Sequence, residues 1–115
     1  MALPDVVMQS AFGTVEAYCE QRLPAHVQDQ VRMEATMRGK AITIWERRPP
    51  FRPEYGPDWS KTKIAQLRFE SASRLWSLWW ADRNGRWRAY PAPLQPTVEA
   101  ALATIEADPV SAFYG

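Results

Sequence analysis

Residues 62–90 read TKIAQLRFESASRLWSLWWADRNGRWRAY, and this stretch decides the fold. Two turn signals, Ser71-Ala72-Ser73 and Asn84-Gly85, divide it into three runs rich in aromatic and β-branched residues. Runs of this kind, separated by short turn sequences, are typical of a three-stranded antiparallel meander. The meander holds four of the six tryptophans of the chain: Trp76, Trp79, Trp80 and Trp87.

A second strand-forming region precedes the meander, at residues 30–47. Apolar residues alternate with polar or charged ones from Val31 to Met37, and the same alternation resumes after Gly39-Lys40. A period of two with an intervening glycine turn predicts a hairpin that has one apolar face.

A long loop at residues 48–61, RPPFRPEYGPDWSK, joins the hairpin to the meander. Its four prolines and one glycine predict irregular structure. A solvated linker would not carry Phe51, Tyr55 and Trp59, so we expect the loop to fold back over an edge or end of the sheet. In a sharper version of this hypothesis, it forms a lid over a binding surface.

Helices are predicted at both ends of the chain. Apolar residues recur at helical spacing over 5–23, and again over 97–108, where Thr97 is a suitable N-cap. The tail, 109–115, carries Phe113 and Tyr114 and is expected to dock on the body. An amphipathic helix needs a surface to cover, and the apolar face of the sheet supplies one. We therefore predict an α+β two-layer sandwich, with a five-stranded antiparallel meander sheet and both helices packed on one face.

Length and composition limit the class of protein. A chain of 115 residues, 46% of them hydrophobic, fits one globular domain over 1–115. The single cysteine, Cys19, cannot form an intramolecular disulfide, which favours a reducing cytoplasm. We expect Cys19 to be an inert buried thiol and His26 to be a loop residue. One Cys and one His are too few for a zinc site, so we predict no metal and no cofactor. We also expect no signal peptide and no association with a membrane, because the sequence has no long apolar run.

Several short motifs of this chain resemble one known family. They are Glu46-Arg47-Arg48-Pro49-Pro50, Leu67-Arg68-Phe69, the run from Trp76 to Trp80, Asp82-Arg83-Asn84, Trp87, Tyr90, Asp108-Pro109 and Phe113-Tyr114-Gly115. With them the chain resembles the bacterial domain-of-unknown-function family number three thousand and twenty-four. Phe51 and Tyr114 stand where that family usually has tryptophan. The resemblance implies one small domain and carries over no activity, cofactor or catalytic residue.

The charges are distributed unevenly along the chain. Residues 38–90 carry twelve Lys and Arg against five Asp and Glu, a net charge of +7, whereas 1–37 and 91–115 each carry −3. A basic segment of this kind favours an anionic partner. Pairing of a basic sheet with acidic helices would account for the same distribution without any partner.

Strand alternation assigns a set of aromatic and basic residues to the sheet face that the helices leave open. The candidate binding residues on this face are Trp45, Arg47, Arg68, Trp79, Arg86, Arg88 and Tyr90. The same alternation turns Trp87 and Ala89 toward the core. Tryptophan, tyrosine and arginine are enriched at interface hot spots, so we predict a non-catalytic module that binds a protein partner or a second copy of the chain.

Other interpretations of this face stay open. Aromatic rings that alternate with arginine also suit single-stranded nucleic acid, because rings stack on bases and guanidinium groups contact phosphates. Cation–π packing without a ligand, and a small anionic ligand or substrate, are further alternatives. The carboxylates Glu46, Asp58, Glu70 and Asp82 show no catalytic spacing, so we predict no enzyme. A deep pocket that holds Glu46, Arg47 and Arg68 together would favour catalysis instead.

Overall fold

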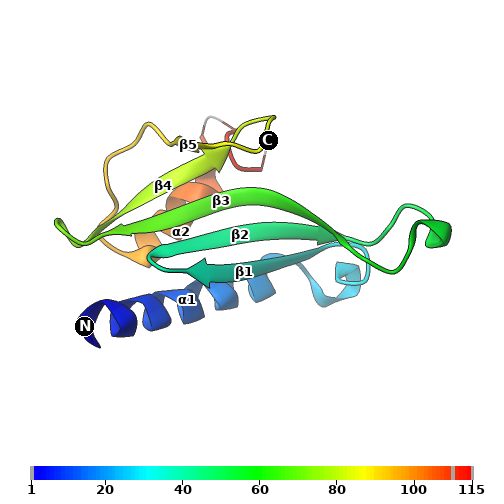
Figure 1. Ribbon diagram of the computed structural model, residues 1–115, viewed down its shortest axis with the longest axis horizontal. Coiled ribbons are helices and arrows are strands. Elements are labelled where there is room, and N and C mark those ends of the chain that lie inside the picture. Colours follow the sequence, from blue (N-terminus) through cyan, green and yellow to red (C-terminus); the bar gives the residue numbers. More distant parts are fainter. Residues whose placement is uncertain (1, 110, 115) are drawn as a thin grey trace.

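The chain forms a single five-stranded antiparallel sheet in the order β1-β2-β3-β4-β5, so that each strand pairs with its neighbour in sequence (Figure 1). This computed structural model describes residues 2–109 and 111–114. The strands are β1 Arg32–Arg38, β2 Ala41–Arg48, β3 Ser60–Glu70, β4 Leu75–Ala81 and β5 Trp87–Ala89. Tight connections at Gly39 and at Ser71–Arg74 require left-handed backbone, with φ of 60° at Gly39 and 59° at Arg74.

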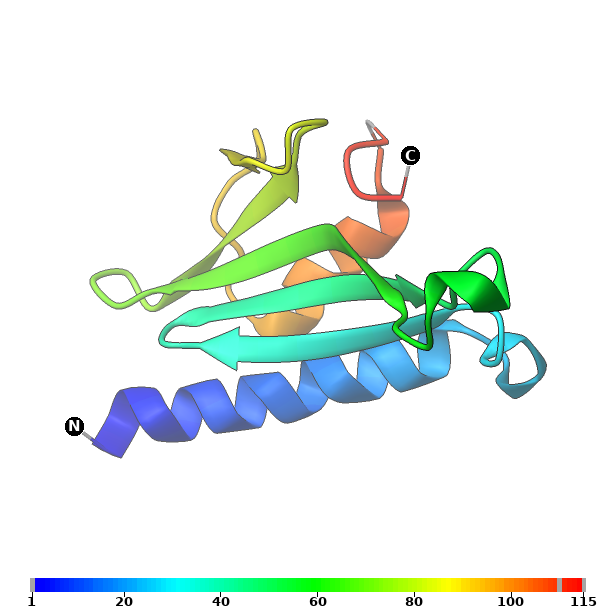
Figure 2. The ribbon, with the colours of Figure 1, turned by 45° about the vertical axis from the view of Figure 1, so that its right-hand side comes forward.

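Two helices form the second layer and cover one face of the sheet, which confirms the predicted α+β sandwich (Figures 1 and 2). Helix α1 spans Ala2–Arg22 and helix α2 spans Val98–Ala107. The first helix begins three residues before the predicted start, with Pro4 in its first turn, where the missing N–H removes no helical bond. Both helices bury their apolar stripes against the inner strand residues. The largest fully buried side chains are Val15, Ile42, Ile44, Leu67 and Ile105.

The register of the strands defines the opposite face, which we call the outer face. Residues that lie directly opposite one another in an antiparallel pair point to the same side of the sheet. Thr43 pairs with Gln66, which in turn pairs with Trp79, and these three residues belong to the outer face. Farther along, the register between β2 and β3 shifts by one residue, so that Trp45 pairs with Lys63. The bulged residue, Ile64, is buried on the core side, and Trp45 stays on the outer face.

The connection from β4 to β5 reverses the predicted facing of strand five. Ala81 pairs with Trp87 and Trp80 pairs with Arg88, so Trp87 shares the outer face with Trp79 while Arg88 shares the opposite side with Trp80. Tyr90 is only 9% exposed and packs against Phe113, with 4.9 Å between ring centroids. The prediction that Arg86, Arg88 and Tyr90 accompany Trp79 on the outer face is therefore wrong.

The turn geometry explains this reversal. A two-residue Asn84-Gly85 turn would pair Arg83 with Arg86, but the observed loop is one residue longer and is closed by Asp82 and Arg86. The Asp82 carboxylate accepts hydrogen bonds from the backbone N–H groups of Asn84 and Arg86, at 2.9 Å each. Gly85 adopts a φ of 77°, as the left-handed position of a three-residue hairpin loop requires. A shift of one residue moves every side chain of the strand to the other face.

Residues 49–59, between β2 and β3, form a projecting arm that extends the end of the sheet (Figure 1). The prediction that this loop folds back over the sheet is wrong, because the arm points away from the body and Phe51 is 89% exposed. Tyr55, in the short 3₁₀ helix Pro53–Tyr55, is 69% exposed. The outer face therefore remains open.

The C-terminal tail lies against the helices. Asp108 ends α2 in the left-handed conformation, with a φ of 41°, and its carboxylate accepts hydrogen bonds from Phe113 N and Tyr114 N at 3.0 and 2.8 Å. Phe113 is buried beside Tyr90, and the Tyr114 hydroxyl contacts the Tyr18 hydroxyl on α1. Val110 and Gly115 of the predicted 109–115 tail lie outside the described residues.

Candidate binding face

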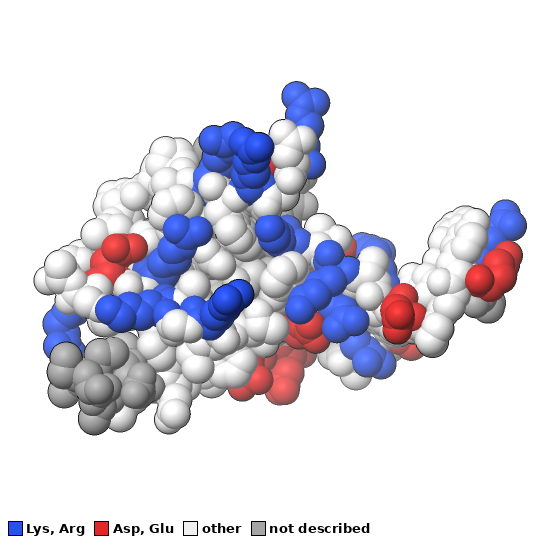
Figure 3. Space-filling model, viewed as in Figure 1, with Lys and Arg blue, Asp and Glu red and all other residues white. Residues whose placement is uncertain are grey.

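Cations outnumber carboxylates on the outer face. By strand register, the face carries six basic side chains, namely Arg32, Arg38, Arg47, Lys61, Lys63 and Arg68, against Glu34 and Glu70. Lys and Arg side chains gather over the strands on the side of the molecule that Figure 3 shows. A surface with this imbalance produces a positive potential that attracts anionic partners.

Each of the three tryptophans on the outer face carries a cation on its ring. Lys61 Nζ lies 4.2 Å from the centroid of Trp45, Arg68 Cζ lies 3.7 Å from that of Trp79, and Lys63 Nζ lies 5.4 Å from that of Trp87. All three distances fall within the range of a cation–π interaction. The three cations come from β3, the central strand, while the rings stand on its neighbour β2 and on β4 and β5.

A hydrogen-bonded network fixes the middle of the face. Gln66 donates to the Thr43 hydroxyl at 2.9 Å and accepts from Arg68 Nε at 2.6 Å. Trp79 Nε1 donates to the Ser77 hydroxyl at 2.9 Å, and Ser77 donates to Glu70 at 2.7 Å. Burial lowers the pKa of Arg68, while the negative charge of Glu70 opposes that shift. The Arg68 side chain is therefore held in place on the sheet surface.

Arg47 anchors the end of the face nearest the arm. Its Nη1 lies 3.1 Å from Glu34 Oε1, and its Nε and Nη2 donate to the carbonyls of Ser60 and Trp59. Arg32 lies over the ring of Trp59, 4.6 Å from the centroid. These contacts join β1, β2 and the base of the arm, so Arg47 holds the arm where it leaves the sheet.

Four of the seven predicted binding residues share the outer face: Trp45, Arg47, Arg68 and Trp79. Arg86 lies in the turn before β5, Arg88 pairs with Asp82 at 2.9 Å, and Tyr90 is buried. The sequence interpretation missed four of the six cations on this face: Arg32, Arg38, Lys61 and Lys63. The i, i+2 spacing of the two lysines was an available signal, but Lys61 fell in the predicted loop and the bulge at Ile64 displaces the alternation of both lysines.

The residues that would favour catalysis do not converge. Arg47 pairs with Lys61 at one end of β3, whereas Arg68 pairs with Ala41 at the other end. Glu46 points to the side opposite Arg47 and forms an ion pair with Arg48 at 2.8 Å. Among the described residues, no group of three or more His, Cys, Asp and Glu side chains could hold a metal ion.

The only cysteine among the described residues is a buried thiol on α1. Cys19 is 3% exposed, and burial together with nearby carboxylates, of which Glu16 contributes most, raises its pKa to about 12. Such a thiol is a poor nucleophile because the reactive thiolate is scarce at neutral pH. No described helix has both the length and the apolar character needed to cross a membrane.

This architecture defines a two-layer α+β domain with a basic, aromatic sheet face. The sequence profile of the DUF3024 family, described as a domain of unknown function, matches residues 3–115. The chain therefore belongs to the DUF3024 family. No curated protein and no solved structure matches it.

Proposed function

We propose that this domain is a non-catalytic binding module that holds an acidic segment of a partner protein on its outer face. The observation that carries the proposal is the excess of cations on an open face whose tryptophan rings are already covered by Lys61, Arg68 and Lys63. A partner that approaches this face therefore meets the charged groups before it reaches the aromatic rings. Carboxylate side chains are the protein groups that pair with ammonium and guanidinium ions.

The fixed geometry of the face supports a protein partner. Trp79 and Arg68 are held by internal hydrogen bonds, so little side-chain freedom is lost when a partner binds. Tryptophan and arginine at the centre of a patch are the residue types that carry most of the binding energy at protein interfaces. We place the module in the bacterial cytoplasm, in keeping with its lone reduced thiol.

Single-stranded nucleic acid is the second candidate, and one observation favours it. The Arg68 guanidinium covers the ring of Trp79 at 3.7 Å, and a guanidinium plane can itself stack on a base. The resulting Trp–Arg pair would act as an extended stacking platform. Direct stacking on the rings of Trp45 and Trp87 would require the lysines to move aside.

Anisotropy titrations with a labelled glutamate-rich peptide and a labelled single-stranded RNA, at low and at moderate salt, test the proposal. We expect Lys61→Ala and Arg68→Ala each to weaken peptide binding about tenfold, as removal of a central interface residue does. Arg83→Ala is the matched control, because it removes one positive charge from the exposed turn after β4 and should leave affinity unchanged.

Each outcome of the titrations has a clear meaning. Peptide binding that falls in the two outer-face variants and not in the control supports the proposed partner. Binding of the RNA alone, with a salt slope that decreases by about one for each lost cation, replaces it with the second candidate. Equal weakening by all three substitutions, or no binding of either probe at low salt, refutes the outer face as a binding site.

A further inference from the structure

The arm at residues 49–59 exposes two large aromatic side chains to solvent. Phe51 is 89% exposed and Tyr55 is 69% exposed, and both belong to the arm, which projects from the end of the sheet (Figure 1). The longest dimension of the molecule is 49 Å, along the axis on which the arm projects. Two large aromatic side chains that are this exposed on one short segment make it a candidate interaction site.

The arm is preorganised. Prolines 49, 50, 53 and 57 fix the backbone, and Gly56, with a φ of 100°, turns the chain in a way that other residues adopt poorly. Arg47 and Arg32 hold its base through Trp59 and Ser60. A fixed segment loses little conformational entropy when it docks, so its exposed rings are suited to binding.

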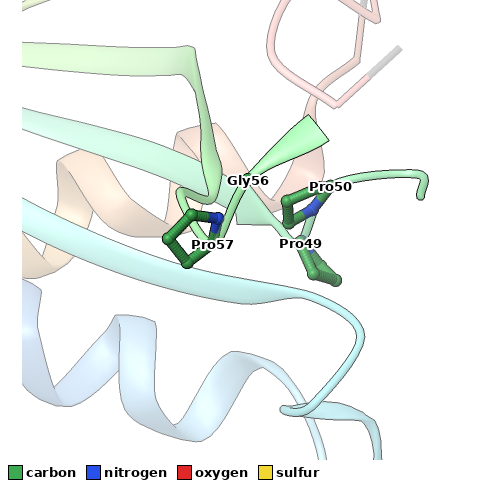
Figure 4. A pocket seen from close by; sticks show the side chains of 4 residues that line it. All are labelled: Pro49, Pro50, Gly56 and Pro57. Carbon is green, nitrogen blue, oxygen red and sulfur yellow. The ribbon is translucent and has the colours of Figure 1, made fainter. Parts of the chain in front are cut away.

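The arm also carries a shallow apolar hollow. Pro49, Pro50, Gly56 and Pro57 line a hollow with mostly apolar walls, and Figure 4 shows Pro57 facing Pro49 and Pro50 across it. A second hollow beside it is lined by Pro49, Pro50, Tyr55 and Trp59, among others. The same segment therefore presents a projecting aromatic side chain and a concave apolar surface.

We propose that the arm is a self-association surface, and that two copies of the chain dock arm to arm about a two-fold axis. In a two-fold interface the same patch serves both copies, so the patch must be complementary to itself. In the proposed dimer, Phe51 of each copy would enter the proline-lined hollow of the other. The proposal concerns a surface distinct from the outer face, and its failure leaves the proposed function untouched.

Charge supports a second copy over other occupants. The arm carries Arg52 beside Glu54, and Figure 3 shows both signs of charge together on it. The two residues form an exposed ion pair within the arm, with 3.8 Å between Arg52 Nη1 and Glu54 Oε1. In the proposed dimer each would exchange this partner for the opposite charge across the axis. An antiparallel arrangement of two arms brings Arg52 of one copy to the partner subunit's Glu54. The arm carries one cation, Arg52, against two carboxylates, Glu54 and Asp58, so its net charge is 1 − 2 = −1, which disfavours an anionic membrane surface.

The size of the patch sets the expected affinity. Each buried aromatic side chain contributes about 150–250 Å², so two rings per copy bury roughly 300–500 Å² on each side. A standard stable interface buries about 800 Å² per partner. The arm-to-arm dimer is therefore expected to dissociate in the micromolar range and to exchange rapidly.

Sedimentation velocity across a wide range of concentrations tests the inference. We expect the mass to rise from 13.2 kDa toward twice that value as concentration increases through the micromolar range. Phe51→Ser should raise the dissociation constant about 30-fold or more, as loss of a hot-spot residue does. Leu94→Ser is the matched control, since it removes an exposed apolar side chain away from the arm and should not affect dimerisation.

A charge-swap mixture tests the two-fold pairing. Arg52→Glu makes an acidic arm and Glu54→Arg makes a basic arm, so each variant alone should dimerise more weakly than the native chain. An equimolar mixture of the two should form a heterodimer at least as readily as the native chain dimerises, because opposite charges then face each other across the axis. A mass that stays at 13.2 kDa at every concentration, or dimerisation that Phe51→Ser leaves unchanged, overturns the inference. A mixture that associates no better than its components also overturns the charge pairing.

Discussion

The contact between Arg68 and Trp79 allows a quantitative test of how the outer face is stabilised. Arg68 Cζ lies 3.7 Å from the ring centroid, and the partly buried guanidinium has lost some of its hydration. Cation–π contacts are worth about 0.5–1 kcal/mol at exposed sites and about 2 kcal/mol when they are desolvated. We therefore expect a coupling free energy of about 1 kcal/mol between these two side chains.

A double-mutant cycle isolates this coupling from the other bonds that each residue makes. Arg68→Leu also removes the hydrogen bond to Gln66, and Trp79→Leu also removes the one to Ser77. These losses cancel in the cycle, because each is present in a single variant and again in the double variant. Urea denaturation of the four proteins gives the free energies of unfolding. A coupling of 1 kcal/mol corresponds to a shift of roughly 0.5 M between the midpoint measured for the double variant and the midpoint expected if the two single effects were additive.

A second cycle supplies the control. Trp45 pairs with Lys63, five residues away from Arg68 along β3, so Arg68 and Trp45 should show coupling within about 0.3 kcal/mol of zero. A coupling below that limit for Arg68 and Trp79 would refute the cation–π assignment. A change in the slope of the denaturation curve would instead indicate that a variant had altered the folded or unfolded state, and the cycle would then need conservative replacements.

Four further predictions concern the core, the tail and strand five. Cys19 should react with a thiol reagent at pH 8 at least about a hundredfold more slowly in the native protein than in urea. The reason is that burial and a raised pKa leave little accessible thiolate in the folded state. Equal reaction rates in the two conditions would contradict this. Since that pKa is higher in the folded state, the Cys19 contribution to stability should be lost as pH rises from about 9 toward 12, which pH-dependent urea denaturation of the native chain and of Cys19→Ala would measure. Asp108→Ala should lower the free energy of unfolding by about 2–3 kcal/mol, because it removes two hydrogen bonds to the tail and places alanine in left-handed backbone, whereas Asp108→Asn should cost less; equal melting temperatures for the two variants would contradict this. Trp87→Ala should cost only about 1 kcal/mol, whereas Tyr90→Ala should cost about 3 kcal/mol, because Trp87 faces outward and Tyr90 packs on Phe113. The reverse order in thermal denaturation would show that strand five faces the other way.

The sequence pattern was sufficient to predict the layers and the strand order. Alternation over β1 and β2, the turns on either side of β4 and the two amphipathic helices all depend on local spacing, and each indicates a single sheet with one covered face. The fold class therefore follows from hydrophobic periodicity together with the turn sequences.

Only part of the candidate site could be predicted from the sequence. The side of the sheet on which its residues lie depends on two places where the chain has one extra residue. An extra residue at Ile64 shifts β3 against β2, and the loop closed by Asp82 is one residue longer than the Asn84-Gly85 dipeptide suggests. Alternation has a period of two, so one inserted residue inverts every later assignment on that strand. The Asp82 side chain was the available signal, since an aspartate that caps two backbone N–H groups is typical of a longer turn.

The projecting arm escaped prediction for a different reason. The aromatic residues predict that the loop folds back over an edge or end of the sheet, because burying a large ring is favourable when a surface lies within reach. In the structure the segment projects instead, with four prolines that restrict its backbone and with Phe51 and Tyr55 exposed. The aromatic content of a segment therefore predicts that its rings form contacts. It does not say whether those contacts lie within the chain or with another molecule.

Three cations line the central strand, and each has a polar partner within the domain. Lys61 Nζ lies 3.9 Å from Glu34 Oε1, Lys63 donates to the Gly85 carbonyl at 2.6 Å and Arg68 donates to Gln66 at 2.6 Å. Lys61 and Lys63 stand on the same face two residues apart, roughly 7 Å, and like charges at that distance repel each other by about 0.6 kcal/mol in water. The contacts of these lysines with Trp45, Trp87, Glu34 and the Gly85 carbonyl offset this repulsion. The rings thus make a concentrated positive charge tolerable in the free protein, and an anionic partner that approaches the outer face would gain from that charge directly.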